Sequence, residues 1–153
     1  MSTLIWRHRR ENLKKCSLKG LESRPDLRFI TYPTDPLPDL SRCLVLQLGA
    51  PPLTLQDAQS DILLIDGTWR LAQVMLKQLP PFLEARSLPG NYLTAYPRRQ
   101  TDCPDPRLGL ASIEALYIAH LILGRSTENL LDGYHWQKQF LYANGLSNTR
   151  TDQ

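Results

Sequence analysis

An uninterrupted apolar run is the feature that most constrains this fold. Residues 62–65 read Ile-Leu-Leu-Ile, a run without polar alternation. Such a run is typical of a central strand in a parallel sheet, because helices bury both faces of that strand. Every third or fourth position from 69 to 79 is then apolar, and prolines at 80 and 81 end this helical pattern. The segment therefore predicts a strand, a tight turn and a helix, which together form half of an α/β unit.

Shorter segments predict the remaining elements. Branched and aromatic side chains favour strands over residues 4–6, 28–32, 43–48 and 91–96. We expect a helix from Ser112, as its cap, to about residue 123, where Gly124 ends it. A last helix is expected from Ser126, with an apolar stripe of Leu130, Leu131, Tyr134 and Phe140. No repeat or linker divides the chain, so we predict one domain over residues 1–153, with a basic part over about 1–30 and a frayed tail over about 146–153.

The charge of the chain is mildly positive and unevenly distributed. The 153 residues carry a net charge of +3, with 42% hydrophobic and 22% charged residues, a composition that argues against wholesale disorder. Residues 7–28 hold eight cations and three acids, a surplus of five positive charges. This surplus suits a phosphate backbone, and it is equally consistent with a basic face that only contacts solvent.

The cysteines favour a reducing compartment. Cys16, Cys43 and Cys103 lie far apart and form no C-x-x-C pair, which argues against a zinc site and against a disulfide framework. No run of eighteen apolar residues occurs, and the first residues do not resemble a signal peptide. We therefore expect a cytoplasmic protein with no metal and no membrane span; nothing in the sequence indicates its oligomeric state.

The turn after the apolar run is the first candidate site. Asp66, Gly67 and Thr68 follow a buried strand and precede a helix, and open α/β sheets bind ligands in the crevice beyond the carboxyl ends of their strands. A glycine there lets a ligand approach the main chain. The simpler interpretation is that Asp66 or Thr68 only caps the helix and that Trp69 belongs to the core.

Other common sites are disfavoured. The turn matches neither glycine-rich phosphate-binding pattern, and the chain lacks G-x-S-x-G, so neither a nucleotide held in those ways nor a serine hydrolase is favoured. His120 lies in an apolar helical segment, where a hydrogen-bonded core histidine is the expected role. Arg98 and Arg99, with Arg107 nearby, form a loop suited to bind phosphate or carboxylate, or a charged surface without such a role.

Four blocks in order resemble the DTW-domain family. They are "HRRENLKKCSLKGL", "LIDGTWRLAQVML", "YPRRQ" and "GLASIEAL", which together span residues 8–115. The name of the family refers to an Asp, a Thr and a Trp, here Asp66, Thr68 and Trp69. Arg9 replaces the proline usual in the first block, and Ser17 stands in place of a threonine. The first block and the ending "DGYHWQKQFLYAN" also resemble the related small-subunit rRNA aminocarboxypropyltransferases.

This resemblance implies a SPOUT-like α/β fold, a mostly parallel sheet flanked by helices, and it allows a C-terminal trefoil knot. It further implies transfer of the 3-amino-3-carboxypropyl (acp) group from the co-substrate S-adenosylmethionine to N3 of a uridine in tRNA. The alternatives are the same transfer to uridine or pseudouridine in small-subunit rRNA, a SPOUT-like RNA methyltransferase, and a non-catalytic RNA-binding module.

The resemblance also suggests roles for individual residues. Asp66 is expected either to act as the general base or to orient the nucleotide, with Glu114 as the competing candidate for the base. The residues expected to hold the co-substrate are Gly67, Thr68, Trp69 and Ser112. The residues expected to hold RNA phosphates are Arg10, Lys14, Lys15, Arg98 and Arg99.

Overall fold

A parallel sheet forms the centre of the molecule. The computed structural model describes residues 2–10, 16–97 and 109–146. Within these residues a five-stranded sheet has the order β2-β1-β4-β3-β5, with every pair parallel. The strands are β1 (Thr3–His8), β2 (Leu27–Tyr32), β3 (Cys43–Leu46), β4 (Asp61–Asp66) and β5 (Glu84–Arg86). The helices are α1 (Trp69–Leu76), α2 (Ser112–Leu123), α3 (Gln137–Ala143) and the single turn η1 (Leu55–Asp57). The predicted α/β fold with a parallel sheet flanked by helices is confirmed, and the knot stays a prediction.

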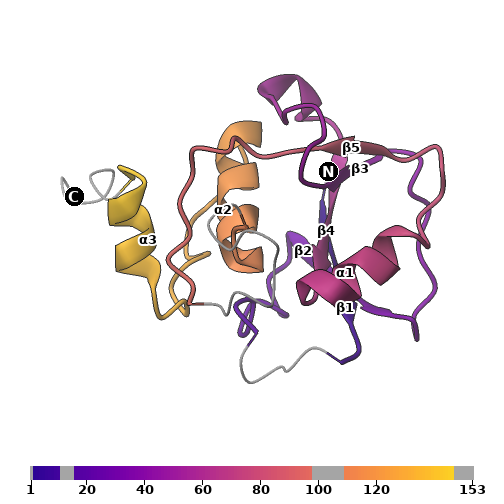
Figure 1. Cartoon of the computed structure of the whole chain (residues 1–153), viewed down its shortest axis with the longest axis horizontal. Coiled ribbons are helices and arrows are strands. Elements are labelled where there is room, and N and C mark those ends of the chain that lie inside the picture. The colour runs from indigo at the N-terminus through magenta and orange to yellow at the C-terminus, as the bar shows by residue number, and fades with distance from the viewer. Residues whose placement is uncertain (1, 11–15, 98–108, 147–153) are drawn as a thin grey trace.

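Helices cover both faces of the sheet. Figure 1 shows α1 on one side of the sheet and α2 on the other, with α3 beyond α2. Ile5 of β1 packs in one cluster with Leu116 of α2, whereas Leu63 of β4 packs in another with Met75 of α1. All four side chains are at most 1% exposed, as expected for strands that are buried on both faces. No helix in the described ranges has the length and apolar character needed to cross a membrane.

The strand order reverses direction between β1 and β4. From β1 the chain continues to β2, on one side, whereas from β4 it continues to β5, on the other side. The loops at the carboxyl ends of these two neighbours therefore diverge, which is the usual position of a ligand site in an open α/β sheet. The register pairs Arg7 of β1 with Asp66 of β4 at this edge.

The first strand is longer than the sequence predicted. We expected it over residues 4–6, followed by a charged loop, but β1 continues through Arg7 and His8, which are 8% and 6% exposed. Both residues pair with β2, and Arg7 also pairs with β4. Main-chain pairing on two sides extends the strand, and the buried charge of Arg7 is compensated by the ion pair described below.

The strand predicted over residues 91–96 is absent. That segment is irregular, β5 forms earlier at Glu84–Arg86, and β3 ends at Leu46 rather than at residue 48. In this segment, hydrogen bonds to side chains replace the main-chain hydrogen bonds that a sheet would provide. Asn144 accepts a hydrogen bond from the Leu93 amide at 2.7 Å and donates one to its carbonyl at 2.9 Å. Propensity alone could not anticipate these partners, which are distant in sequence.

The two later helices differ from prediction at their starts. α2 ends at Gly124 as expected, with φ of 72°, but its cap is Ala111, and Ser112 is its first residue. The last helix begins at Gln137 rather than at Ser126. Asn129 adopts a left-handed φ of 62°, which interrupts a helix in this stretch. The four residues of the predicted stripe are buried nonetheless.

His120 is a satisfied core histidine, as expected. Its Nε2 lies 2.9 Å from Thr3 Oγ1 and its Nδ1 lies 2.9 Å from the Ser126 carbonyl, so Nδ1 carries the proton. The side chain is 1% exposed, and burial lowers the pKa of His120.

Stability should therefore fall in mild acid. Between the lowered pKa of folded His120 and the ordinary value of about 6.5, the unfolded chain binds a proton that the folded chain does not. The free energy of unfolding should decrease as pH falls below about 6.5, by at most about 1.4 kcal/mol per pH unit for each such group. Urea unfolding measured across this pH range should show a smaller change in unfolding free energy per pH unit for His120→Gln than for wild type. The exposed His135→Gln is the matched control, and equal slopes for wild type and His120→Gln would contradict the prediction.

Candidate functional site

Asp66 is the centre of a buried polar cluster at the carboxyl end of β4. Its side chain accepts three hydrogen bonds: Oδ2 from Arg7 Nε at 3.0 Å and from the Cys16 thiol at 3.2 Å, and Oδ1 from Ser112 Oγ at 2.9 Å. The residue is only 2% exposed. One carboxylate thus connects β4, β1, the loop after β1 and the start of α2.

Arg7 provides the positive charge of this cluster. Nη1 donates to Glu22 Oε2 at 3.2 Å, and the guanidinium lies 4.8 Å from the centre of the Phe29 ring. Burial disfavours the charged form of Arg7, but hydrogen bonds and charge interactions with Asp66, Cys16 and Glu22 outweigh burial and raise its pKa. The guanidinium is therefore a permanent cation inside the site.

Cys16 acts in the cluster as a neutral donor. Burial, and secondarily the negative charge of Asp66, raises the pKa of the Cys16 thiol to about 12. A thiol that stays protonated at neutral pH is a poor nucleophile. Its sulfur also accepts from the amide of Leu18 at 3.4 Å, which orders the loop at residues 16–18. The neighbouring Ser17 Oγ accepts from the amide of Ile113 at 3.1 Å, so the same loop contacts α2.

These contacts determine what Asp66 can do chemically. Its two oxygens already hold a guanidinium, a thiol and a hydroxyl, and almost none of its surface is exposed. The geometry therefore favours a carboxylate that orients neighbouring groups over one that contacts a ligand directly.

The turn after Asp66 is more open. Thr68 caps α1, since its Oγ1 accepts from the Leu71 amide at 3.4 Å. Gly67 does not adopt a left-handed φ, and an added Cβ would meet His8 and Leu71 at an ordinary 3.5 Å, so the fold itself does not require glycine there. Trp69 is 36% exposed and lies outside the hydrophobic clusters, so the interpretation of Trp69 as a core residue is wrong.

His8 lies beside this turn as a neutral ring. Its Nδ1 accepts a hydrogen bond from the Arg10 amide at 3.0 Å, and its ring lies 5.2 Å from that of Tyr32. Burial and the positive charges of Arg10 and Arg9 lower the pKa of His8. The end of β1 therefore presents an uncharged imidazole next to Gly67.

Glu114 lies in a second buried cluster. The residue is 0% exposed and accepts four hydrogen bonds: from Thr94 Oγ1 at 2.6 Å, from the amides of Ala95 and Ala111 at 2.8 Å each, and from the Tyr134 hydroxyl at 2.9 Å. These donors come from three separate segments. The contacts favour a carboxylate that holds the irregular segment around residue 95 onto the start of α2.

Aromatic rings pack around the segment that Glu114 holds. Tyr96 is nearly parallel to Tyr134, with ring centres 6.4 Å apart and planes 7° apart. Trp136 meets Tyr96 edge-on at 5.2 Å and Tyr134 edge-on at 6.0 Å. The segment that replaces the predicted strand is thus fixed on one side by a carboxylate and on the other by rings.

The predicted RNA-binding residues are only partly described. Arg10 is exposed at the end of β1. Lys14, Lys15, Arg98 and Arg99 lie outside the described residues. Among the described residues, no group of three His, Cys, Asp or Glu side chains is arranged to hold a metal ion.

The sequence did not identify Arg7 and Cys16 as partners of Asp66. Arg7 directly follows the apolar residues 4–6 and opens a charged stretch, so no local pattern marked it as a buried, paired residue. The identity of the partner depends on the strand order, which no local pattern reveals.

A separate cavity of about 380 Å³ lies between β3 and α1. Its lining includes Gln47, Gln73 and Lys77, with apolar walls from Leu76 and Leu83. None of the predicted site residues lines it.

Comparisons with known proteins connect the fold to one solved structure. No protein-family model matches the chain, and no curated protein matches it. The structure of the SAM-dependent rRNA acp-transferase Tsr3 from Vulcanisaeta distributa is similar, with a TM-score of 0.72 and 23% identity. The similarity covers 97% of this chain and 81% of the Tsr3 chain. The two proteins share a fold, and the resemblance to the DTW-domain family rests on the sequence blocks alone.

The ion pair between Arg7 and Asp66 yields a stability prediction. Arg7→Met leaves a buried carboxylate without its cation, which should cost about 3–5 kcal/mol of unfolding free energy. The double variant Arg7→Met/Asp66→Leu removes both charges, so its loss should be clearly smaller than the sum of the two single losses. Urea unfolding of all four proteins measures this coupling.

The more exposed pair of Arg24 and Asp26, 2.6 Å apart, is the control, and its coupling should be at most about 1 kcal/mol. Additive losses at Arg7 and Asp66 would show that the two charges do not depend on each other.

Proposed function

We propose that this protein transfers the acp group from S-adenosylmethionine to N3 of a uridine or pseudouridine in RNA. The observation that carries the proposal is the similarity of its fold to Tsr3, a SAM-dependent rRNA acp-transferase, over 97% of the chain. The buried cluster around Asp66 lies at the carboxyl edge of the sheet, where this class of fold binds ligands.

The residues at this edge suit the co-substrate. Trp69 offers a partly exposed indole that no core cluster uses, which fits a flat adenine ring. Gly67 has no side chain although the fold does not require glycine there, so its main chain is open to close approach. Ser112 Oγ, which donates to Asp66, and Thr68 Oγ1, which caps α1, are the polar groups proposed to contact the amino-acid end of the molecule.

The proposed reaction is an in-line displacement. S-adenosylmethionine supplies an electrophilic carbon bonded to a sulfonium. A bond forms from N3 to this carbon, the carbon–sulfur bond breaks, its electron pair stays on sulfur as a neutral thioether, and the proton of N3 passes to water or to a base. Most of the catalytic effect then comes from holding the two reactants in line. The chain contributes groups that are already fixed: Asp66 by three donors and Glu114 by four.

Asp66 is proposed as a positioning residue. It holds Ser112 and leads directly into the turn at Gly67, so its role is to fix the groups that contact the co-substrate. Glu114 has the corresponding role for the segment around residue 95. The competing role, general base, stays open to test for Asp66.

The class of RNA has two candidates. The sequence blocks around Asp66 resemble the DTW-domain family and favour tRNA. The fold similarity to Tsr3 favours rRNA, as do the first sequence block and the C-terminal one. Both substrates require the same transfer chemistry.

The direct test is incubation of the protein with labelled S-adenosylmethionine and total RNA, followed by separation of tRNA from rRNA and nucleoside mass spectrometry. We expect one nucleoside to gain about 101 Da, the mass of an acp group. A gain of about 14 Da would instead indicate a methyltransferase. A non-catalytic RNA-binding module would bind RNA without any gain. It would also not show the increase of about 2.7 kcal/mol in unfolding free energy that S-adenosylmethionine, at 100 times its Kd, gives to a protein that binds it.

A pH profile distinguishes the two roles of Asp66. If Asp66 is a positioning residue, Asp66→Asn should lower the transfer rate and leave the shape of its dependence on pH unchanged, since the titrating proton is that of N3 itself. If Asp66 is the base, the rate should fall by about 10²–10⁴ and the acidic limb of the profile should disappear. Folding of the variant is verified by circular dichroism before the comparison.

A further inference from the structure

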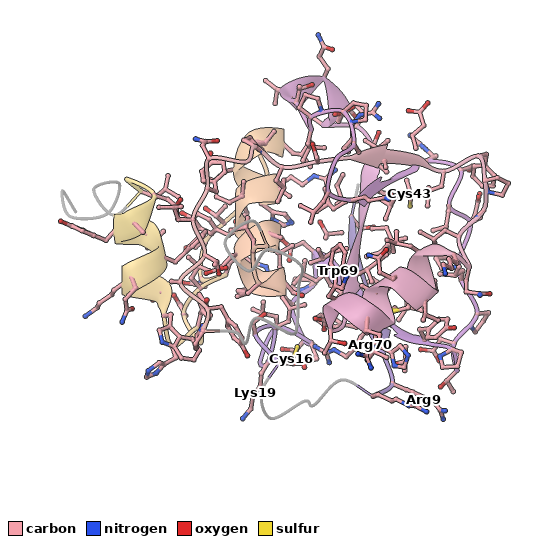
Figure 2. The ribbon with its side chains drawn as sticks, in the orientation of Figure 1. Arg9, Cys16, Lys19, Cys43, Trp69 and Arg70 are labelled. Carbon is pink, nitrogen blue, oxygen red and sulfur yellow. The ribbon has the colours of Figure 1, made fainter. Side chains whose placement is uncertain are left out.

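Exposed cations gather at the carboxyl edge of the sheet. Arg9 follows β1, Arg70 lies in the first turn of α1 after β4, and Lys19 lies in the loop that carries Cys16. All three are exposed, and no ion pair within the described ranges involves them. In Figure 2 they lie along the lower side of the view with Cys16, whereas Cys43, at the start of β3, lies above them.

Two acids near these cations, within the part of the chain that the structure describes, are already engaged. Glu22 accepts from Arg7 and from the Gly20 amide at 2.9 Å, and Asp35 accepts from the Thr31 amide at 2.9 Å. Asp66 is neutralised by its own ion pair. Arg86, by contrast, is paired with Asp57 and Glu84. The unpaired positive charge beside the site is therefore available to an anionic partner, and it flanks the turn at Gly67 from both β1 and α1.

The proposed chemistry limits the form of that partner. N3 of uridine lies on the Watson–Crick edge of the base, and in a duplex it is occupied by pairing with adenine. A base whose N3 reacts must therefore be unpaired, either in a loop or in a single strand. A rim of cations that holds phosphates without reading sequence suits such a strand.

Resting on the proposed function, we infer that Arg9, Lys19 and Arg70 form a phosphate-binding rim around the site and that the bound RNA presents its target base unpaired. Arg9 and Arg70 hold phosphates on the two sides of the turn at Gly67. Each phosphate contact on single-stranded RNA contributes about 0.7 to the slope of log affinity against log salt concentration. Loss of two contacts should therefore reduce the magnitude of that slope by about 1.4.

The test measures binding and transfer in the same samples. Fluorescence anisotropy follows an RNA of about 16 nucleotides with one uridine, offered as a single strand, in the loop of a hairpin, and annealed to its complement. Wild type is compared with Arg9→Gln/Arg70→Gln over a series of salt concentrations. Arg42→Gln is the matched control, because Arg42 is exposed and free of ion pairs among the described residues but precedes β3 at the opposite edge. Transfer of label from S-adenosylmethionine is counted for each RNA.

We expect the single strand and the loop to bind and to be modified, the duplex to stay unmodified, and only the double variant to show the smaller salt slope. Modification of the duplex at the rate of the single strand would overturn the unpaired-base inference. If the double variant keeps the RNA affinity and the salt slope of the wild type, the inference of a phosphate-binding rim is overturned, even if transfer occurs. Absence of transfer with every RNA, while binding still depends on Arg9 and Arg70, would overturn the proposed function and support the rim.

Discussion

The ion pair between Arg7 and Asp66 is the interaction on which the candidate site depends. Both groups are buried at the carboxyl ends of neighbouring strands, and each also contacts a further segment of the chain. Asp66 connects to Ser112 of α2, and Arg7 connects to Glu22 in the loop after β1. Removing two charges from water is costly, so the pair is weak evidence for stability in itself. Its role is better explained by position, because it aligns three segments around one edge of the sheet.

In the candidate site, the buried carboxylates are fixed by hydrogen bonds, whereas other groups are exposed to a ligand. The carboxylates of Asp66 and Glu114 are buried and saturated with donors, so they define shape and leave little surface for a ligand. The accessible groups are Trp69 and the exposed cations Arg9 and Arg70. A rigid polar interior beneath an aromatic and basic rim suits a reaction that depends on alignment more than on a special acid or base.

The parts of the fold that follow from local pattern were predictable from the sequence. The apolar run before Asp66 predicts β4, helical spacing predicts α1, and Gly124 marks the end of α2. Contacts between distant segments were not predictable. β1 extends over Arg7 because it pairs on both sides, and the predicted strand over residues 91–96 is irregular because Asn144 and Glu114 bind its main chain. The motif at Asp66 indicated the candidate site, but the contacts of Asp66 with Arg7 and Cys16 depend on the strand order.

A crystal structure of the protein with S-adenosylmethionine tests the location of the site most directly. We predict that the ligand lies at the carboxyl ends of β1 and β4, in contact with Gly67, Trp69 and Ser112, while Arg7 and Asp66 stay paired. A ligand bound in the cavity of about 380 Å³ beside Gln47 and Lys77, with the turn after Asp66 free, would contradict it.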